Sequence, residues 1–296
     1  MADSKPNIAA LIAQMPDTDQ QKLNPKDPAA AGIHSKFTGP EPEVAEKVFA
    51  AIIEGGRESI LELLAALREP GDAGYTDYKA RYVLHGMCLH AGLPGKEEQR
   101  RLLAETLASQ LKGGSLSTPV KRSLIRELQV AGEKESISAL AECLADTDLC
   151  DSAVQALLAI RTEVAEPLRK ALSNSKGRNL LAVIQALGVL QDRESVATLR
   201  KFLTHDESDV RRISAWALAN IGDADSAGAI LKLASAATGW ERTHATGFCH
   251  LLAEKLAAAG QKDAAARIYT NLRDTRKDPE ERHVRETADR ALKALQ

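Results

Sequence analysis

The stretch Asp206-Glu207-Ser208-Asp209-Val210-Arg211-Arg212, followed by Ala217-Leu218 and Ile221-Gly222-Asp223, decides the fold. It contains a helix start, an apolar anchor and a turn with glycine. The anchor Leu218 has counterparts at Leu187, Leu157 and Leu128, and the intervals along the chain are 29, 30 and 31 residues. A period of this length is typical of stacked helical hairpins. The sequence therefore predicts a repeat array, which is first of all a surface.

Each repeat is predicted to hold two helices joined by a short turn. The turn brings glycine or glutamine, then acidic residues, then serine, as in Gly222-Asp223-Ala224-Asp225-Ser226. Glycine can end a helix in the left-handed conformation, and Asp, Glu or Ser can cap the next helix. Helices joined so tightly lie antiparallel. Each second helix has an apolar triplet on one face: Ile60/Leu63/Leu67, Ile137/Leu140/Leu144, Val196/Leu199/Leu203, Ala227/Ile230/Ala234 and Ala265/Ile268/Leu272.

These patterns predict an all-α fold, a right-handed α-solenoid (superhelix) of about seven antiparallel helical hairpins. We expect residues 1–41 to form an irregular N-terminal arm with one short helix, and residues 42–296 to form the solenoid. Its regular core covers 114–234, and its longer units cover 42–113 and 235–296.

The arm is distinguished by proline, with six of the eleven prolines in the first 42 positions. Proline excludes long helices there. One short helix fits over Asn7 to Met15, with Ile8, Leu11 and Ile12 on the same face as Met15. This stripe either caps the first repeat by packing on it or belongs to a tail that binds a partner.

Composition limits the function classes. Only 3% of the residues are aromatic, so Ala and Leu must supply the core, as they do where helices pack closely side by side. The net charge is −2, from 39 Lys and Arg against 41 Asp and Glu. No overall positive field attracts a polyanion, so nucleic-acid binding is disfavoured.

No apolar stretch is long enough to span a bilayer, and no signal peptide is visible, so we expect a cytoplasmic protein as the sequence stands. A periplasmic or secreted location stays open if a signal peptide has been removed. Each of the four cysteines lies in an apolar helical context, where a free thiol packs like a small hydrophobe. A disulfide between Cys143 and Cys150 is the alternative.

The stretch quoted at the start resembles the short HEAT-like repeats first described in phycobilisome lyases. The resemblance is good over about Gly114 to Ala234, and it is looser over Glu43 to Leu111 and Gly239 to Gln296. It implies a binding scaffold, because most members of this broad family bind partners and a minority are enzymes. A tetratricopeptide-like array is the structural alternative, favoured by the stretch from Ala257 to Ala265.

The first candidate contact site lies between Gly74 and His90, where three of the four tyrosines occur. Tyr78, Tyr82, His85 and Leu89 follow helical spacing and share a face, and Arg81 lies beside them. Tyrosine and arginine often supply binding energy at interfaces. The alternative is that the tyrosine rings pack against the preceding hairpin.

The second candidate is a basic row at equivalent positions of successive second helices. Its members are Arg169, Lys170, Arg200, Lys201 and Lys232. Second helices of HEAT-like arrays usually line the concave face, so the row could hold an acidic partner protein or peptide. A solvated face with glutamate partners is the alternative.

No motif for catalysis or for a cofactor is present. The HEAT-like deoxyhypusine hydroxylases bind iron on paired His-Glu dipeptides, and none of the seven histidines here precedes a glutamate. The triplet His244, Cys249 and His250 has spacings that do not place three ligands on one face. The sequence also lacks a GxSxG elbow and a phosphate-binding GxxxxGK[ST] loop. We therefore predict no catalytic residue, no metal and no cofactor.

The predicted function is a non-enzymatic scaffold that binds a partner protein or peptide on its concave surface. Two alternatives stay open. One is a lyase-like or chaperone protein that handles a small pigment or cofactor, which would need a deep apolar pocket. The other is a HEAT-type nucleic-acid-binding protein, which would need a dense basic groove with aromatic wedges.

Overall fold

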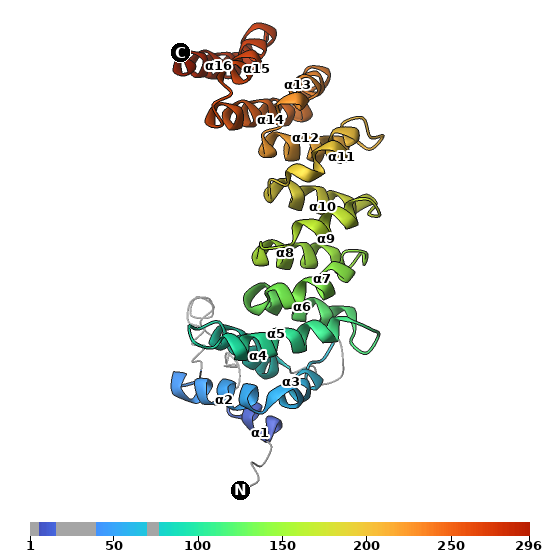
Figure 1. The fold of residues 1–296 in the computed structure, drawn as a ribbon, viewed down its shortest axis with the longest axis vertical. Helices are drawn as coiled ribbons and strands as arrows, with labels where there is room; N and C mark the ends of the chain where they lie inside the picture. Colours follow the sequence, from blue (N-terminus) through green and yellow to red (C-terminus); the bar gives the residue numbers. More distant parts are fainter. Residues whose placement is uncertain (1–5, 16–39, 70–76) are drawn as a thin grey trace, which may run out of the picture. The chain divides into compact units, whose positions relative to one another are not determined.

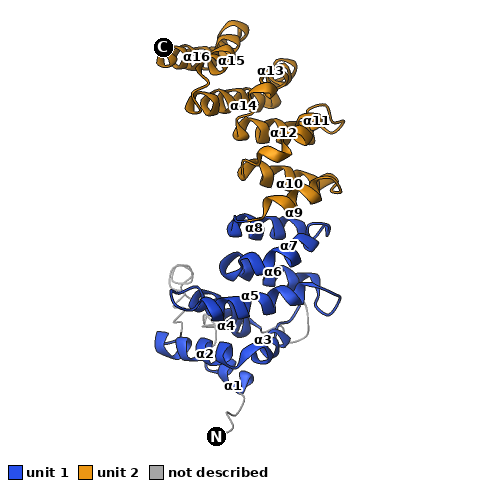
Figure 2. Ribbon diagram, in the orientation of Figure 1, with its two compact units in different colours: residues 1–162 blue, residues 163–296 orange. Residues whose placement is uncertain are grey.

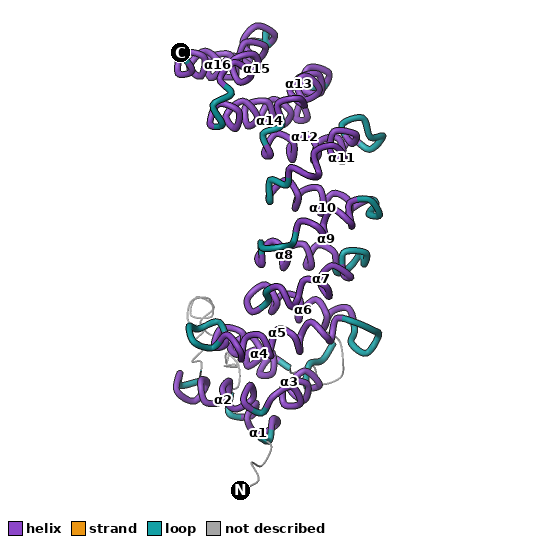
Figure 3. Tube along the Cα trace, in the orientation of Figure 1, coloured by secondary structure: helices purple, strands orange, loops and turns teal. Residues whose placement is uncertain are grey.

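The computed structural model describes residues 6–15, 40–69 and 77–296, which form sixteen α-helices and four short 3-10 helices (Figure 1). No strand occurs within these ranges (Figure 3). The chain divides into two compact units, residues 1–162 and 163–296 (Figure 2). The predicted all-α solenoid of helical hairpins is confirmed.

The first unit consists of α1 (Ile8–Ala13), α2 (Pro42–Glu54), α3 (Gly56–Ala65), α4 (Tyr78–Ala91), α5 (Glu97–Leu111), α6 (Thr118–Ala131), η1 (Lys134–Ser136), α7 (Ile137–Cys143) and α8 (Cys150–Ile160). The first helices of its repeats, α2, α4, α6 and α8, pack one on the next. The second helices α3, α5 and α7 form a parallel row. This two-row arrangement is what the alternation of apolar triplets predicts.

The second unit consists of α9 (Ala165–Leu172), α10 (Gly177–Val189), η2 (Arg193–Ser195), α11 (Val196–Phe202), α12 (Ser208–Ile221), η3 (Ala224–Ser226), α13 (Ala227–Ala236), α14 (Gly239–Ala258), α15 (Lys262–Thr275), η4 (Pro279–Glu281) and α16 (Arg282–Leu295). The first helices α10, α12 and α14 pack in sequence. The second helices α9, α11 and α13 each pack against the first helix that follows, and α15 packs against α14 and α16.

The repeat anchors lie in the core. Leu128, Leu157, Leu187 and Leu218 are all fully buried. Beyond the last of them, Gly222 takes the left-handed conformation with φ 81°, and its amide donates to the carbonyl of Leu218 at 3.1 Å. Glycine occupies this position because side chains rarely adopt a positive φ.

In three repeats, those of α6 and α7, α10 and α11, and α12 and α13, the turn between the two helices is a short 3-10 segment that ends in a buried serine. In the repeat of α10 and α11, the amide of Ser195 donates to the carboxylate of Asp192 at 3.0 Å, and the Ser195 hydroxyl donates to the Asp192 carbonyl at 2.8 Å. Ser226 bonds to Asp223 in the same place one repeat later. The acidic residue thus caps the turn, which gives a structural reason for the repeated Asp-x-x-Ser pattern.

Helix α1 lies against α3 and α4. Asn7 caps it by accepting a bond from the Ala10 amide at 3.0 Å. Ile8 and Met15 are buried, so the apolar stripe of the N-terminal segment packs on the first repeat. Residues 16–39 of the predicted arm lie outside the described residues.

Two repeats outside the regular core have longer second helices. These have 15 residues in α5 and 14 in α15, against 7 in α7, 8 in α9, 7 in α11 and 10 in both α3 and α13. The part of the chain that the structure describes has no helix long and apolar enough to cross a bilayer.

All four cysteines are buried as free thiols, and Cys143 and Cys150 do not form a disulfide. Burial raises the pKa of the Cys143 thiol to about 11 and that of Cys249 to about 12. Both therefore stay protonated at neutral pH and act as packing residues.

Candidate interaction surfaces

The two arginines of the predicted basic row bind the turn of the next repeat. Arg169 on α9 contacts the carboxylate of Asp192 at 2.5 Å and that of Glu194 at 3.1 Å. Arg200 on α11 repeats the arrangement: its Nε donates to Asp223 at 2.8 Å and its Nη2 to Asp225 at 2.8 Å. The two arginines therefore join successive repeats and do not project freely toward a partner.

The pair between Arg200 and Asp223 is the stronger part of this contact, because the carboxylate is nearly enclosed. The Asp223 side chain is 10% exposed, whereas that of Asp225 is 79% exposed. Burial raises the pKa of Asp223, but bonds from the Arg200 guanidinium and the Ser226 hydroxyl outweigh it and hold the pKa below its usual range. The carboxylate is ionised at neutral pH.

A third arginine does the same in the first unit. Arg100 on α5 donates to Glu133 at 2.8 Å and to Glu135 at 2.9 Å, both in the turn before α7. Its Nη1 also donates to the carbonyl of Ala131 at 2.8 Å, at the C-terminal end of α6. Arginine between one second helix and the following acidic turn is thus a recurrent structural device of this chain.

The three lysines of the row are exposed on α9, α11 and α13. Lys170 pairs with Glu166, one turn earlier on its own helix, at 2.7 Å. Lys201 and Lys232 have no carboxylate partner among the described residues. We call Lys170, Lys201 and Lys232 the lysine row, and it is what is left of the predicted basic row once the arginines are assigned to the fold.

The predicted tyrosine-rich site also separates into a structural part and an exposed part. Arg81 on α4 pairs with the buried Asp77 at 2.8 Å and donates to the Ser123 hydroxyl at 2.6 Å and to the Arg68 carbonyl at 3.0 Å. Arg81 therefore joins the segment before α4 to α6. Tyr78 is half-buried at the start of the helix.

The exposed part consists of side chains on α4, just after it and on α6, which packs against α4, and two of them, Leu93 and Val130, were not selected in the sequence analysis. Tyr82 is 36% exposed, and Leu89, on the same face of α4, is 54% exposed. Leu93 follows the helix at 48%, and Val130 on the neighbouring α6 is 43% exposed. We call Tyr82, His85, Leu89, Leu93 and Val130 the α4–α6 patch.

His85 fixes the register of the two helices that form this patch. Its Nδ1 lies 2.9 Å from the Glu127 carboxylate on α6, and the imidazole is 53% exposed. Arg81 and His85 are one turn apart and contact Ser123 and Glu127, which are also one turn apart. The next turn therefore brings Leu89 toward the level of Val130.

Glu127 also reaches Cys88, so a thiol, a carboxylate and an imidazole lie together. This is the reverse of an activated cysteine, because burial and the neighbouring Glu127 carboxylate raise the pKa of the Cys88 thiol well above its usual value. A thiolate nucleophile needs a positive neighbour that lowers the pKa. The group links α4 to α6 and provides no nucleophile at neutral pH.

The region of His244, Cys249 and His250 is structural where it is buried. Arg276, which is 1% exposed, donates to the Ala234 carbonyl at 3.4 Å and to the Thr246 hydroxyl at 3.1 Å. Nearby, Arg242 forms a bidentate pair with Glu281 at 2.7 and 3.0 Å. Within the described ranges, no three His, Cys, Asp or Glu side chains come together as metal ligands.

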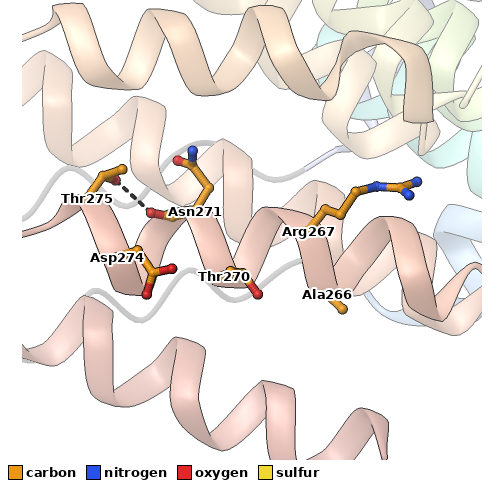
Figure 4. A pocket seen from close by; sticks show the side chains of 6 residues that line it. All are labelled: Ala266, Arg267, Thr270, Asn271, Asp274 and Thr275. Carbon is orange, nitrogen blue, oxygen red and sulfur yellow. Dashed lines mark hydrogen bonds between the residues drawn. The ribbon is translucent and has the colours of Figure 1, made fainter.

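One depression lies along α15. Its lining comes from that helix alone: Ala266, Arg267, Thr270, Asn271, Asp274 and Thr275 (Figure 4). The Thr275 hydroxyl donates to the Asn271 carbonyl at 2.7 Å, so its hydrogen is already used. This lining is mostly polar side chains on one helix, unlike the deep apolar pocket that a pigment would need.

Sequence reasoning missed one further surface feature, an exposed aromatic row on α14. Trp240 is 61% exposed and stacks on His244, with ring centroids 4.0 Å apart. His244 and Phe248 follow at 6.4 Å. The spacing of four residues was visible in the sequence, but the search there was for metal ligands and took His244 with Cys249 and His250.

Comparisons with known proteins agree with this architecture. The sequence profile of HEAT repeats matches residues 165–247. Curated proteins gave no match by sequence. Among solved structures, importin beta is similar over 96% of this chain and 41% of its own, with 15% identity and a TM-score of 0.51.

Two more solved structures have lower TM-scores. The complex of CpcE and CpcF of phycocyanin lyase from Nostoc sp. PCC7120 covers 80% of this chain and 94% of its own, with 17% identity and a TM-score of 0.41. An archaeal HEAT-like repeats protein from Thermococcus onnurineus NA1 covers 85% and 97%, with 14% identity and a TM-score of 0.35. The matched profile shows HEAT repeats over residues 165–247, and both units contain the same paired rows of first and second helices.

Proposed function

We propose that this protein is a non-enzymatic scaffold that binds a partner protein or peptide. The observation that carries the proposal is the distribution of exposed apolar side chains. Among the described residues, six large apolar side chains are exposed: Tyr82, Leu89, Leu93, Val130, Val189 and Trp240. All six lie on first helices or directly after one, although both rows of helices have outward faces.

Four of the six belong to the α4–α6 patch. Scattered apolar side chains on a surface need no explanation, but a contiguous group typically marks an interaction site. The patch also combines tyrosine and histidine, which can bury apolar area and still make polar contacts, with aliphatic side chains. We assign it as the principal contact surface, in place of Tyr78 and Arg81.

The lysine row is the second contact surface of the proposal. Lys170, Lys201 and Lys232 occupy equivalent positions, so their ammonium groups recur once per repeat along the second helices. Such a row suits acidic groups on an extended partner, and its contribution would fall with increasing salt. Arg169 and Arg200 support this surface by holding the repeats in register.

Affinity capture from lysate, followed by mass spectrometry, tests the proposal when it is repeated with surface variants. The patch variant combines Leu89→Ser with Val130→Ser, and the row variant combines Lys170→Glu, Lys201→Glu and Lys232→Glu. Arginine at the same three positions is the control that preserves charge. We expect loss of a captured protein from the patch variant, with helicity and melting unchanged.

The row variant should lose capture only if the partner is acidic there, and the arginine control should then retain it. Capture of the same proteins in the same amounts by wild type, patch variant and row variant would contradict the proposal. Charge reversal at Arg200 is not a suitable test, because it would break the contact with Asp223 and change the fold itself.

A further inference from the structure

The N-terminal turns of α12 and α14 lie side by side and form a second exposed aromatic surface. The guanidinium of Arg212 on α12 lies 5.3 Å from the centre of the Trp240 ring on α14. Trp240, His244 and Phe248 continue this row at intervals of four residues along α14. A neighbouring face of α14, with Ala245, Cys249, Leu252, Ala253 and Leu256, is buried in the repeat core. Trp240 and His244 are exposed and Phe248 is half-buried, so the aromatic row runs from the surface toward the edge of this core face.

Trp240 is the least protected large apolar side chain among the described residues, at 61% exposure. Its partner on the helix, His244, is also exposed. Tryptophan buries a large area when it is covered and is enriched among the residues that dominate interface energies. The sequence holds only two tryptophans, so an exposed one is a considerable share of the aromatic content of the chain.

Carboxylates outnumber guanidinium groups at the starts of the two helices. Four carboxylates lie there, on Asp206, Glu207, Asp209 and Glu241, and all four residues are exposed. The three guanidinium groups in the same segments already have partners, and that of Arg242 pairs with Glu281 at 2.7 Å. Arg211 donates to the carbonyls of His205 and Asp206 at 2.7 Å each, and Arg212 pairs with Asp209 at 2.8 Å.

The contacts of Arg212 show that this surface can hold a cation. Its guanidinium is held between the carboxylate of Asp209 and the face of Trp240, so a cation gains an ion pair and a cation–π contact at once. The carboxylates of Asp206, Glu207 and Glu241 have no ion-pair partner among the described residues. An incoming basic group can use these carboxylates without displacing Arg212.

We propose that the surface formed by Trp240, His244 and Phe248 with the carboxylates of Asp206, Glu207 and Glu241 binds a basic peptide segment, one that presents arginine or lysine next to apolar side chains. The apolar side chains of the segment cover the aromatic row, and its cations pair with the carboxylates. This surface is independent of the lysine row, which favours an acidic partner. Failure of either assignment leaves the other intact.

Selection from a random displayed-peptide library on the full chain tests the proposal. We expect the wild type to enrich peptides with arginine or lysine flanked by apolar residues. Enrichment of acidic or uncharged peptides would overturn the proposal, and so would the absence of any sequence preference. A selected basic peptide, synthesised with a fluorophore, then serves as the probe for affinity measurements.

Three variants test where on the protein the probe binds. Trp240→Ser should bind it about thirtyfold more weakly, which corresponds to a hot-spot loss of about 2 kcal/mol at 1.4 kcal/mol per tenfold. Glu241→Lys should weaken binding and reduce its salt dependence, because Glu241 has no structural partner to lose. Val189→Ser removes an exposed apolar side chain at the C-terminal end of α10 and should bind like wild type.

Folding is checked by far-UV circular dichroism and melting, which these exposed substitutions should leave unchanged. Equal affinity of wild type and Trp240→Ser for the basic probe would overturn the proposal. Equal loss in Trp240→Ser and Val189→Ser would also overturn it, because the effect would then not be specific to the aromatic row. A probe in which glutamate replaces each basic residue should bind at least tenfold more weakly, as expected for like charges across an interface.

Discussion

Replacement of Arg200 by methionine should destabilise the second unit, whereas the same change at the next residue should not. Methionine keeps an unbranched apolar stem and removes the guanidinium. The variant Arg200→Met leaves the Asp223 carboxylate, which is 10% exposed, without its two bonds from Arg200. Lys201→Met is the matched control on the same helix, since the Lys201 ammonium is exposed and has no carboxylate partner in the described part of the chain.

The size of the effect follows from the exposure of the partners. Loss of a partner from a poorly solvated charged group costs about 1.5–3 kcal/mol. The Arg200 side chain is itself 38% exposed, so solvent screening reduces the value. The bond to Asp225 adds little, because that carboxylate is 79% exposed. We therefore expect a loss of about 2 kcal/mol for Arg200→Met and less than about 0.5 kcal/mol for Lys201→Met.

The difference between wild type and Arg200→Met should depend on pH in a defined way. Arg200 holds the pKa of Asp223 below its usual range in the folded state. A carboxyl with a lowered folded pKa contributes stability above its unfolded pKa of about 3.9 and loses it as the pH falls through the folded pKa. The difference should therefore be constant near neutral pH and shrink below about pH 4.

Urea denaturation followed by far-UV circular dichroism measures both free energies of unfolding. Repeat arrays can unfold in more than one step, so a shift confined to one transition is compared with that same transition in wild type. Adding Asp223→Asn to each background completes a double-mutant cycle and isolates the pairwise contribution. Equal effects of Arg200→Met and Lys201→Met would refute the assignment of Arg200 to the fold.

Three further predictions concern packing and titration. Gly188→Ala should cost about 1–3 kcal/mol, measured by urea denaturation, because its Cβ would lie 2.7 Å from the Trp216 ring and 2.8 Å from Ala217 Cβ. Gly247→Ala, in the middle of α14 with open space around its Cβ, should stabilise by about 0.5–1 kcal/mol, and a loss instead would contradict the packing described. Burial lowers the pKa of His250, so stability should fall as the pH drops below the unfolded value of about 6.5, and His250→Phe should lessen that fall between about pH 7 and 5 in melting experiments.

The regular part of the fold could be predicted because its local signals repeat. Leu128, Leu157, Leu187 and Leu218 keep nearly constant intervals and are all buried. The turn pattern also places a buried serine at each occurrence, and at Asp192 the acidic residue caps the 3-10 segment. Because the residues of each turn are close together in the sequence, the turn pattern can be recognised without knowledge of tertiary contacts.

The division of the basic row into structural arginines and exposed lysines could not be read from a single helix. It depends on partners in the next repeat, since Arg169 reaches Asp192 and Arg200 reaches Asp223. A signal was nevertheless present: both pairs are separated by 23 residues, which is constant in the repeat frame. The sequence analysis considered glutamate partners without placing them, and the structure pairs Lys170 with Glu166 on its own helix and Arg169 with Glu194 in the next repeat.

The surfaces on first helices were harder to predict because exposure is a property of the assembled stack. Leu93 and Val130 have the residue type of a core position, and nothing local distinguishes them from buried leucines and valines. Trp240 lies in the longer unit over residues 235–296, where apolar residues occur on more than one face of α14. Arg81 illustrates the opposite error, since its type suits an interface while three bonds commit it to the fold.

Quantitative capture with the patch variant is the most direct test of whether the α4–α6 patch binds a partner. The experiment compares wild type, the combined Leu89→Ser and Val130→Ser variant, and Val189→Ser as an exposed aliphatic control outside the patch. We expect a captured protein to be lost only from the combined variant, at unchanged melting temperature. Equal capture by all three proteins would contradict this expectation.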